Sequence, residues 1–235
     1  MGTAESAESA ESAVGAPPRP GLRERKKQRT RDALVRAALE LIATRGYEGT
    51  TVDDIVAAVD VSQRTFFRYF AGKEEVAFFV ARLAESRVLD AVRARPPHEA
   101  PLEVLRRAVL DSWDGITEAV EQLVPLDLHM RVYRVIESTP ALLAAHLRRA
   151  TELEEELARV IAEREGLDVD ADPRPRILVA AFGGVVRVAE RRWSAGDDCS
   201  PEAMRAVMTA CLDQVGPALA GNWRTGPSPN RGTET

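Results

Sequence analysis

The sequence predicts an all-α fold in which an N-terminal three-helix domain with a helix-turn-helix precedes a larger C-terminal helical domain. Three observations predict it. Apolar residues recur at three- and four-residue spacing along most of the chain, which is the period of a helix with one buried face. Strand-like alternation is absent from the long C-terminal part. Gly, Pro, Ser and Thr residues divide the helical pattern into segments with recognisable starts and stops.

The two ends of the chain are predicted to be disordered tails. Residues 1–22 contain a repeated Ala-Glu-Ser unit followed by a cluster of Pro and Gly. Such a composition cannot bury a core. Residues 223–235 are assigned in the same way. The structured part then divides into residues 23–73, with the helix-turn-helix, and residues 74–222, the larger helical domain.

Charge is distributed unevenly along the 235 residues, although the formal net charge is −5. Residues 23–73 hold 11 Lys/Arg and 7 Asp/Glu, whereas residues 74–235 hold 20 and 27. A basic module on an acidic body is typical of a nucleic-acid binder with a separate regulatory domain. We therefore expect the smaller module, and not the larger one, to contact nucleic acid.

Several classes of protein are excluded by what the sequence lacks. Cys199 and Cys211 are too few for a disulfide framework, and they have no nearby histidine with which to bind zinc. His98, His129 and His146 lie far apart, without a nucleophile elbow, a Gly-rich phosphate loop or metalloprotease spacing. We therefore expect no enzyme activity and no cofactor.

A metal site and a membrane span are also not expected. The loop at residues 167–175 alternates aspartates like a calcium loop, but Pro173 and Val179 stand where that loop needs Gly and Glu. No stretch is long and apolar enough to cross a bilayer, and the N-terminus lacks a signal peptide. The protein is expected to be cytoplasmic.

The helix-turn-helix is predicted at residues 51–73. Thr51 has the character of an N-cap, and two carboxylates follow it in the first turn, where the helix dipole favours negative charge. A short helix then ends at Asp60, a residue type that tolerates the left-handed conformation. Ser62 is predicted to cap a second helix, in which Phe66 and Phe70 face the core.

The remaining side chains of this second helix are expected to point outward. Arg reads guanine edges, Gln reads adenine, and hydroxyls suit phosphates, so the set favours base reading over mere solubility. The alternative is an ordinary surface helix with a solvated charged face. The outward residues are Gln63, Arg64, Thr65, Phe67, Arg68 and Tyr69.

A basic run from Leu22 leads into the preceding helix, which is predicted at residues 30–45. Arg25 and Lys26 belong to this run. Placed just before a helix-turn-helix, the run is expected to meet phosphates or to reach a minor groove as a flexible arm. A solvated helix face is the alternative.

Residues 26–80 resemble the DNA-binding domain of the TetR family of bacterial transcription regulators. The likeness rests on Gly46-Tyr47, Thr50-Thr51-Val52, Val61-Ser62, the run from Thr65 to Phe70, and Lys73-Glu74. Two departures are Asp60, where the family often has Gly, and Phe67, where many members have Tyr. The predicted DNA contacts are Arg25, Lys26, Thr51, Gln63, Arg64, Thr65, Phe67, Arg68, Tyr69 and Lys73.

The larger domain is predicted to consist of six further helices. Their boundaries follow from prolines, glycines and caps: residues 74–94, 101–123, 126–136, 141–165, 174–195 and 201–220. Within the helix at 174–195, the stretch from Ile177 to Val188 is apolar nearly all round, so it must be buried on every side. The resemblance implies that the last two long helices form a four-helix bundle with a second subunit. Val207, Cys211 and Val215 are candidate interface residues.

A small-molecule pocket is implied by the same resemblance. Large residues of the middle helices that could line it are Trp113, Met130, Tyr133, Phe182 and Val186, although each could equally be plain core. An acidic ligand could contact His129, Arg131, Arg134 or Arg187, although solvated surface is the alternative for these. The segments RVIESTPALLAAHL and RVAERRW also resemble actinobacterial family members associated with acyl-coenzyme A.

The function predicted from the sequence is that of a TetR-type repressor. It would bind a palindromic operator as a homodimer and release it on binding a small hydrophobic or acidic ligand. The alternatives are an architectural DNA-binding protein without a ligand, and an all-helical ligand carrier that never touches DNA.

Overall fold

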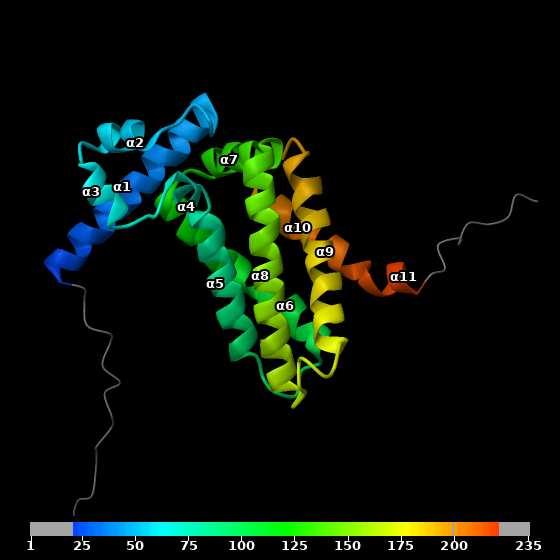
Figure 1. Cartoon of the computed structure of the whole chain (residues 1–235). Helices are drawn as coiled ribbons and strands as arrows, with labels where there is room; N and C mark the ends of the chain where they lie inside the picture. Colours follow the sequence, from blue (N-terminus) through cyan, green and yellow to red (C-terminus); the bar gives the residue numbers. More distant parts are fainter. Residues whose placement is uncertain (1–20, 199, 221–235) are drawn as a thin grey trace, which may run out of the picture.

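The computed structural model describes residues 21–198 and 200–220, and within them the chain is helical without strands (Figure 1). The predicted tails lie outside these residues, except that Leu22 already belongs to a helix. The helices are α1 (Leu22–Arg45), α2 (Val52–Val59), α3 (Gln63–Phe67), α4 (Lys73–Ala77), α5 (Phe79–Ala94), α6 (Pro101–Leu123), α7 (Leu126–Ser138), α8 (Pro140–Arg164), α9 (Arg174–Ser194), α10 (Pro201–Asp213) and α11 (Val215–Leu219).

Helix α1 begins at Leu22, eight residues before the predicted start, so the basic run is helical and not a flexible arm. The run contains mostly Arg, Lys, Gln and Glu, which are good helix formers. Side-chain pairs one turn apart support it. Glu24 lies 3.6 Å from Lys27, and the Gln28 amide donates to Asp32 at 2.9 Å.

The helix-turn-helix forms as predicted. The Asp54 amide donates to the Thr51 hydroxyl at 3.1 Å, and the Thr51 amide donates to the Asp54 carboxylate at 2.9 Å, which makes a capping box. Asp60 adopts the left-handed conformation with φ of 54° and ends α2. Ser62 then caps α3 by accepting from the Thr65 amide.

Two predicted helices are broken in the structure. The segment predicted at 74–94 divides into α4 and α5 at Phe78. The break lets two neighbouring rings pack on different partners: Phe78 stacks on His146 of α8, and Phe79 meets Phe70 edge-on. The segment predicted at 201–220 divides into α10 and α11, because Pro217 has no N–H to continue the helical hydrogen bonds.

The first hydrophobic core extends across the predicted domain boundary between residues 73 and 74. It contains Phe66 and Phe70, both buried as predicted, together with side chains from α1, α2 and α4. It also contains the C-terminal end of α6, the apolar face of α7 and the start of α8. Arg36 of α1 donates to the Leu123 carbonyl at the end of α6, at 3.0 Å. The helix-turn-helix therefore packs directly on the near end of the larger domain (Figure 1).

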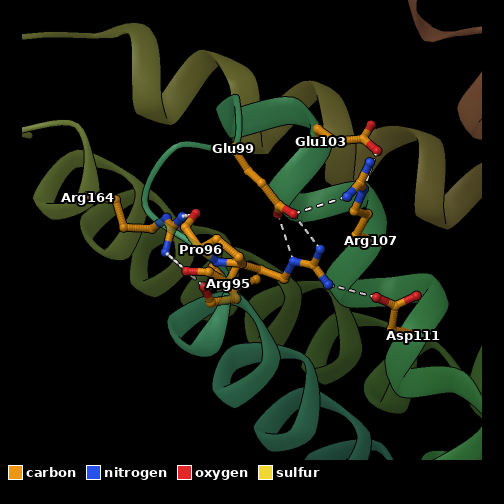
Figure 2. A network of polar contacts seen from close by, with 8 residues as sticks. Arg95, Pro96, Glu99, Glu103, Arg107, Asp111 and Arg164 are labelled. Atoms are coloured by element: carbon orange, nitrogen blue, oxygen red, sulfur yellow. Dashed lines mark hydrogen bonds and ion pairs between the residues drawn. The ribbon is translucent and has the colours of Figure 1, made fainter.

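A polar network closes the far end of the larger domain, where α5 turns into α6 (Figure 2). Arg164, at the end of α8, donates to the carbonyls of Arg95 at 2.8 Å and Pro96 at 2.7 Å. The Arg95 guanidinium donates to Glu99 at 2.7 Å and to Asp111 of α6, also at 2.7 Å. Three helices are thereby held together at this end.

No helix in the described part of the chain is long and apolar enough to span a bilayer. Within the same residues, no group of three His, Cys, Asp or Glu side chains is placed to hold a metal ion. In the loop before α9, the aspartates pair with arginines: Asp172 with Arg174 and Asp170 with Arg176.

Lys73 ties the start of α4 to the turn between α1 and α2. Its ammonium donates to the carbonyls of Tyr47 at 2.8 Å and Thr50 at 3.0 Å, and it lies 4.1 Å from the centre of the Tyr47 ring. Lys73→Met leaves both carbonyls without this donor, so we expect the free energy of unfolding to fall by about 1–3 kcal/mol in urea titrations. Lys26→Met, at an exposed position, is the control and should change it by less than about 0.5 kcal/mol. Equal effects of the two variants would show that the ammonium does not stabilise the turn.

Candidate DNA-binding surface and ligand cavity

The exposed face of α3 carries the side chains predicted to read DNA. Arg64 is exposed, and its guanidinium has no hydrogen-bond or ion-pair partner among the described residues. The Phe67 ring is 54% exposed and meets Phe66 edge-on, with ring centres 5.4 Å apart. Arg68 and Tyr69, which lie in the turn after α3, hold each other, because the Arg68 guanidinium donates to the Tyr69 hydroxyl at 3.2 Å.

The other predicted contacts of this region already have partners inside the protein. The Gln63 amide donates to Asp53 of α2. Thr51 uses its hydroxyl in the cap of α2, and the Thr65 hydroxyl lies 3.1 Å from that of Ser62. The Lys73 ammonium faces the turn between α1 and α2. All of them remain predicted contacts. To bind DNA, each of these side chains would have to share its present hydrogen bond within the protein with a DNA group, or replace it.

A cavity of roughly 250 Å³ lies inside the larger domain, with walls from α5, α6, α7, α8, α9 and α10. Four of the five predicted lining residues line it: Trp113, Tyr133, Phe182 and Val186. Met130 does not, because its side chain is buried in a second hydrophobic core, which it forms with residues of α5, α6, α8, α9 and α10. Most of the wall is apolar, so the cavity suits an apolar molecule.

Polar groups gather on the α7 side of this cavity. Tyr133 donates to the Glu190 carboxylate of α9 at 3.4 Å. Burial raises the pKa of Glu190 to about 7 and raises the pKa of Tyr133 well above its usual range. His146 of α8 places its ring edge-on to Tyr133, with centres 6.2 Å apart, and stacks on Phe78 with its other face.

His129 lines the cavity one helical turn before Tyr133. Its imidazole has no hydrogen-bond partner among the described residues. Burial lowers the pKa of His129 to about 4, because nothing nearby compensates the desolvation of the charged form. The ring is therefore neutral at pH 7, with one nitrogen that accepts and one that donates.

The arginines that were expected to meet an acidic ligand do not form an anion site. Arg187 lines the cavity, but it forms an ion pair with Glu154 of α8. Arg131 lies on the exposed side of α7, 3.5 Å from Asp127, and Arg134 is exposed as well. The described wall therefore holds three carboxylates, from Glu85, Glu154 and Glu190, and a single arginine.

Comparison with known proteins identifies both parts of the chain. The model described as "Bacterial regulatory proteins, tetR family" matches residues 34–78, and the one described as "MftR C-terminal domain" matches residues 99–220. The regulator TcmR of Streptomyces glaucescens is 46% identical over 94% of this chain and 98% of its own length. The chain belongs to the TetR family.

Further similarities extend over most of this TetR-family chain. A Mycobacterium tuberculosis regulator named MftR is 28% identical, over 83% of the chain and 93% of its own length. TetR-family regulators of known structure from Syntrophomonas wolfei and Aquifex aeolicus superpose with TM-scores of 0.55 and 0.51. Their coverage of this chain is 85% and 79%, and of their own chains 99% in each case. At 15% and 13% identity, these two structures show the shared fold alone.

Glu190 is among the cavity residues that sequence reasoning missed. A signal for it was present, because Val179, Phe182, Val186 and Glu190 follow each other at helical spacing on one face of α9. A carboxylate that continues an apolar stripe is costly to bury, so it marks a candidate functional position.

The raised pKa of Glu190 should make the stability of this TetR-family protein depend on pH. The unfolded chain releases this proton near the ordinary value of 4.5, whereas the folded chain keeps it until about pH 7. Stability therefore falls as pH rises through this window. Relative to Glu190→Gln, which cannot titrate there, the wild type should lose about 2–3 kcal/mol between pH 5 and 8 in denaturant titrations.

Glu121→Gln, at an exposed position of α6, is the matched control. It should follow the wild-type pH profile. If Glu190→Gln follows that profile too, Glu190 ionises normally in the folded protein.

Proposed function

We propose that the protein is a cytoplasmic transcriptional repressor that binds a palindromic operator as a homodimer and releases it when a small molecule enters the cavity. The observation that carries this proposal is the contact between His146 and Phe78. His146 lines the cavity, and its ring stacks on Phe78 at 12° between planes, with centres 6.4 Å apart. Phe78 lies between α4 and α5. A ligand that contacts His146 in the cavity is therefore separated only by the His146 ring from the segment that connects the larger domain to the helix-turn-helix.

DNA recognition is assigned to α3 and to the start of α1. Arg64 offers an uncommitted guanidinium, which suits a guanine edge in the major groove. Phe67 offers an apolar surface for a thymine methyl group. Arg25 and Lys26 lie in the exposed first turn of α1, where they would meet phosphates. One such module contacts too few base pairs to select a genomic site, which favours a dimer on a two-fold operator.

The dimer interface is assigned to one face of α9 and α10. Within the single chain, Ile177 is 64% and Val188 is 51% exposed, although both are large apolar side chains of α9. A second subunit would cover this face. Of the residues predicted for the interface, Cys211 and Val215 are instead buried within the chain, and Val207 is half-buried.

Release requires that the ligand bind one arrangement of the helices better than the other. The shared core provides the connection, because α4 packs on α1 and α7 packs on the other side of the same core. A shift of Phe78 would therefore change the position of the helix-turn-helix relative to the dimer axis, and with it the spacing of the two α3 helices. An architectural DNA-binding protein has no need of such a cavity.

The first test is a selection of genomic DNA fragments with the purified protein at physiological salt. We expect recovery of a palindrome whose half-sites lie about one or more helical turns apart. In a reporter strain, the operator should reduce transcription in the presence of the protein. Recovery of unselective, salt-labile fragments alone would overturn the proposal and favour the architectural alternative.

Two variants separate base reading from phosphate contact. Arg64→Ala should weaken binding to the selected operator by about 1–3 kcal/mol and relax preference at one base position in each half-site. Lys26→Ala should weaken binding to all sequences alike and reduce the dependence on salt by about one charge. Both are measured by fluorescence anisotropy with operator and scrambled duplexes. A uniform loss in Arg64→Ala would assign that residue to phosphate instead.

The interface is tested with a charge on the exposed face of α9. Val188→Asp should convert the dimer into a monomer in sedimentation-velocity experiments, because an unpaired carboxylate is costly to bury. Ala144→Asp places the same charge on an exposed position of α8 and should leave the dimer intact. A dimer in both variants would place the interface elsewhere.

A further inference from the structure

The cavity has one polar end within otherwise apolar walls. Side chains such as Ile116, Phe182 and Trp193 form the apolar part. The polar end comes from α7 and α9, where His129 and Tyr133 lie one turn apart and Tyr133 contacts Glu190. This arrangement suits a molecule with an apolar body and one polar group.

The imidazole of His129 is the unsatisfied member of this polar end. It is half-buried, lines the cavity and makes no hydrogen bond with any described residue. Its side chain is partly accessible from the cavity, so a ligand there can reach ring nitrogens to which no described residue bonds. The neutral ring offers one nitrogen that donates and one that accepts, and a hydroxyl group can bond to either of them.

The charges around the cavity disfavour an anion. Glu85 of α5 pairs with Arg149, and Glu154 of α8 pairs with Arg187, so these four charges are already compensated. Glu190 has Tyr133 as its hydrogen-bond partner and no arginine of its own.

The other titratable groups near Glu190 do not reverse this balance. Glu137 of α7 adds negative charge, and His146 of α8 is held neutral because burial lowers its pKa. A carboxylate on the ligand would therefore enter a region of excess negative charge without a free cation to meet it.

The size of the cavity limits the ligand further. A cavity of about 150 Å³ with apolar walls holds one benzene molecule, so roughly 250 Å³ accommodates a compact body of two or three small rings. A long acyl chain with a coenzyme A group would not be enclosed by this volume.

Building on the proposed function, we propose that the cavity selects an uncharged, compact, apolar molecule that carries a hydroxyl group, and that this hydroxyl bonds to His129 beside the Tyr133–Glu190 pair. A hydroxyl can donate to the accepting nitrogen of the imidazole or accept from the donating one, and it brings no charge to the Glu190 side. Of the small hydrophobic or acidic ligand expected from the sequence, this assignment keeps the hydrophobic body and not the acidic group.

The test uses four molecules that share one body and differ in one group: 1-adamantanol, 1-adamantanecarboxylate, 1-adamantanamine and 1-methyladamantane. Binding to the full-length protein at pH 7.5 is followed by tryptophan fluorescence, since Trp113 and Trp193 line the cavity, and by calorimetry. We expect 1-adamantanol to bind at least tenfold more tightly than each of the others, the amine included, because removing its ammonium from water costs more than its attraction to Glu190 returns. Equal or tighter binding of the carboxylate, the amine or the methyl compound would overturn the assignment, as would a lack of binding by all four.

Two variants identify the groups responsible. His129→Phe keeps a ring but removes both nitrogens, so 1-adamantanol should fall to the level of 1-methyladamantane. Glu190→Gln removes the charge, so binding of the carboxylate should strengthen at least fivefold while the alcohol changes little. His98→Phe, at an exposed position outside the cavity, is the control and should keep the wild-type ratios. Unchanged ratios in both test variants would overturn the assignment, and the wild-type ratios remain decisive if either variant fails to fold.

These measurements do not depend on DNA. Selective binding of the alcohol without operator binding would overturn the proposed function and leave the cavity assignment intact. Operator binding without selectivity among the four molecules would overturn the cavity assignment and leave the proposed DNA binding intact. If the alcohol binds selectively but does not release the operator in anisotropy titrations, the proposed ligand-induced release is wrong. The assignment of the cavity to an uncharged molecule with a hydroxyl group is then retained.

Discussion

The single hydrophobic core that joins the helix-turn-helix to the larger domain is the constraint on which the rest of the structure depends. Phe66, Val76 and Phe78 are buried in it together with residues of α6, α7 and α8. Each fully buried large apolar side chain contributes about 1.5–3 kcal/mol, so the two parts cannot separate without losing a substantial share of the stability. The DNA-binding helices are therefore not an independent domain on a flexible linker. Their position is fixed by the same packing that encloses the near end of the cavity.

The polar end of the cavity is unfavourable for stability, which is the physical reason to connect it with function. An apolar residue in place of Glu190 or His129 would relieve the desolvation that moves both pKa values toward the neutral forms. Groups with such perturbed pKa values cluster at functional sites, and structural ion pairs account for other cases. Here Arg149 and Arg187 already pair with other carboxylates, so Glu190 is not part of a structural ion pair.

Local signals in the sequence were sufficient to predict the helix-turn-helix, but they were insufficient to predict where the later helices are interrupted. The Thr51 cap, the left-handed Asp60 and the burial of Phe66 each follow from rules that involve a few neighbouring residues. The break at Phe78 lies where that ring contacts His146, which is 68 residues away in the sequence, and no local pattern indicates it. Met130 was misplaced for a related reason, since helical spacing predicts a buried face but does not tell core from cavity wall. The contacts with DNA and with a ligand involve molecules outside the chain, and they remain proposals.

The hydrogen bonds of Arg164 to the turn after α5, here called the clamp, affect how far α5 can be displaced by a small structural change in the cavity. Helix α5 has 16 residues and therefore extends about 24 Å from the clamp to Phe79. Because Arg164 holds the distal end of α5 (Figure 2), a tilt of this helix would pivot about that end. A rotation of about 5° around that pivot corresponds to a displacement of about 2 Å at the other end, on the basis of this length. A small tilt of α5 at its held end therefore produces a larger displacement at its other end, where α5 meets α4.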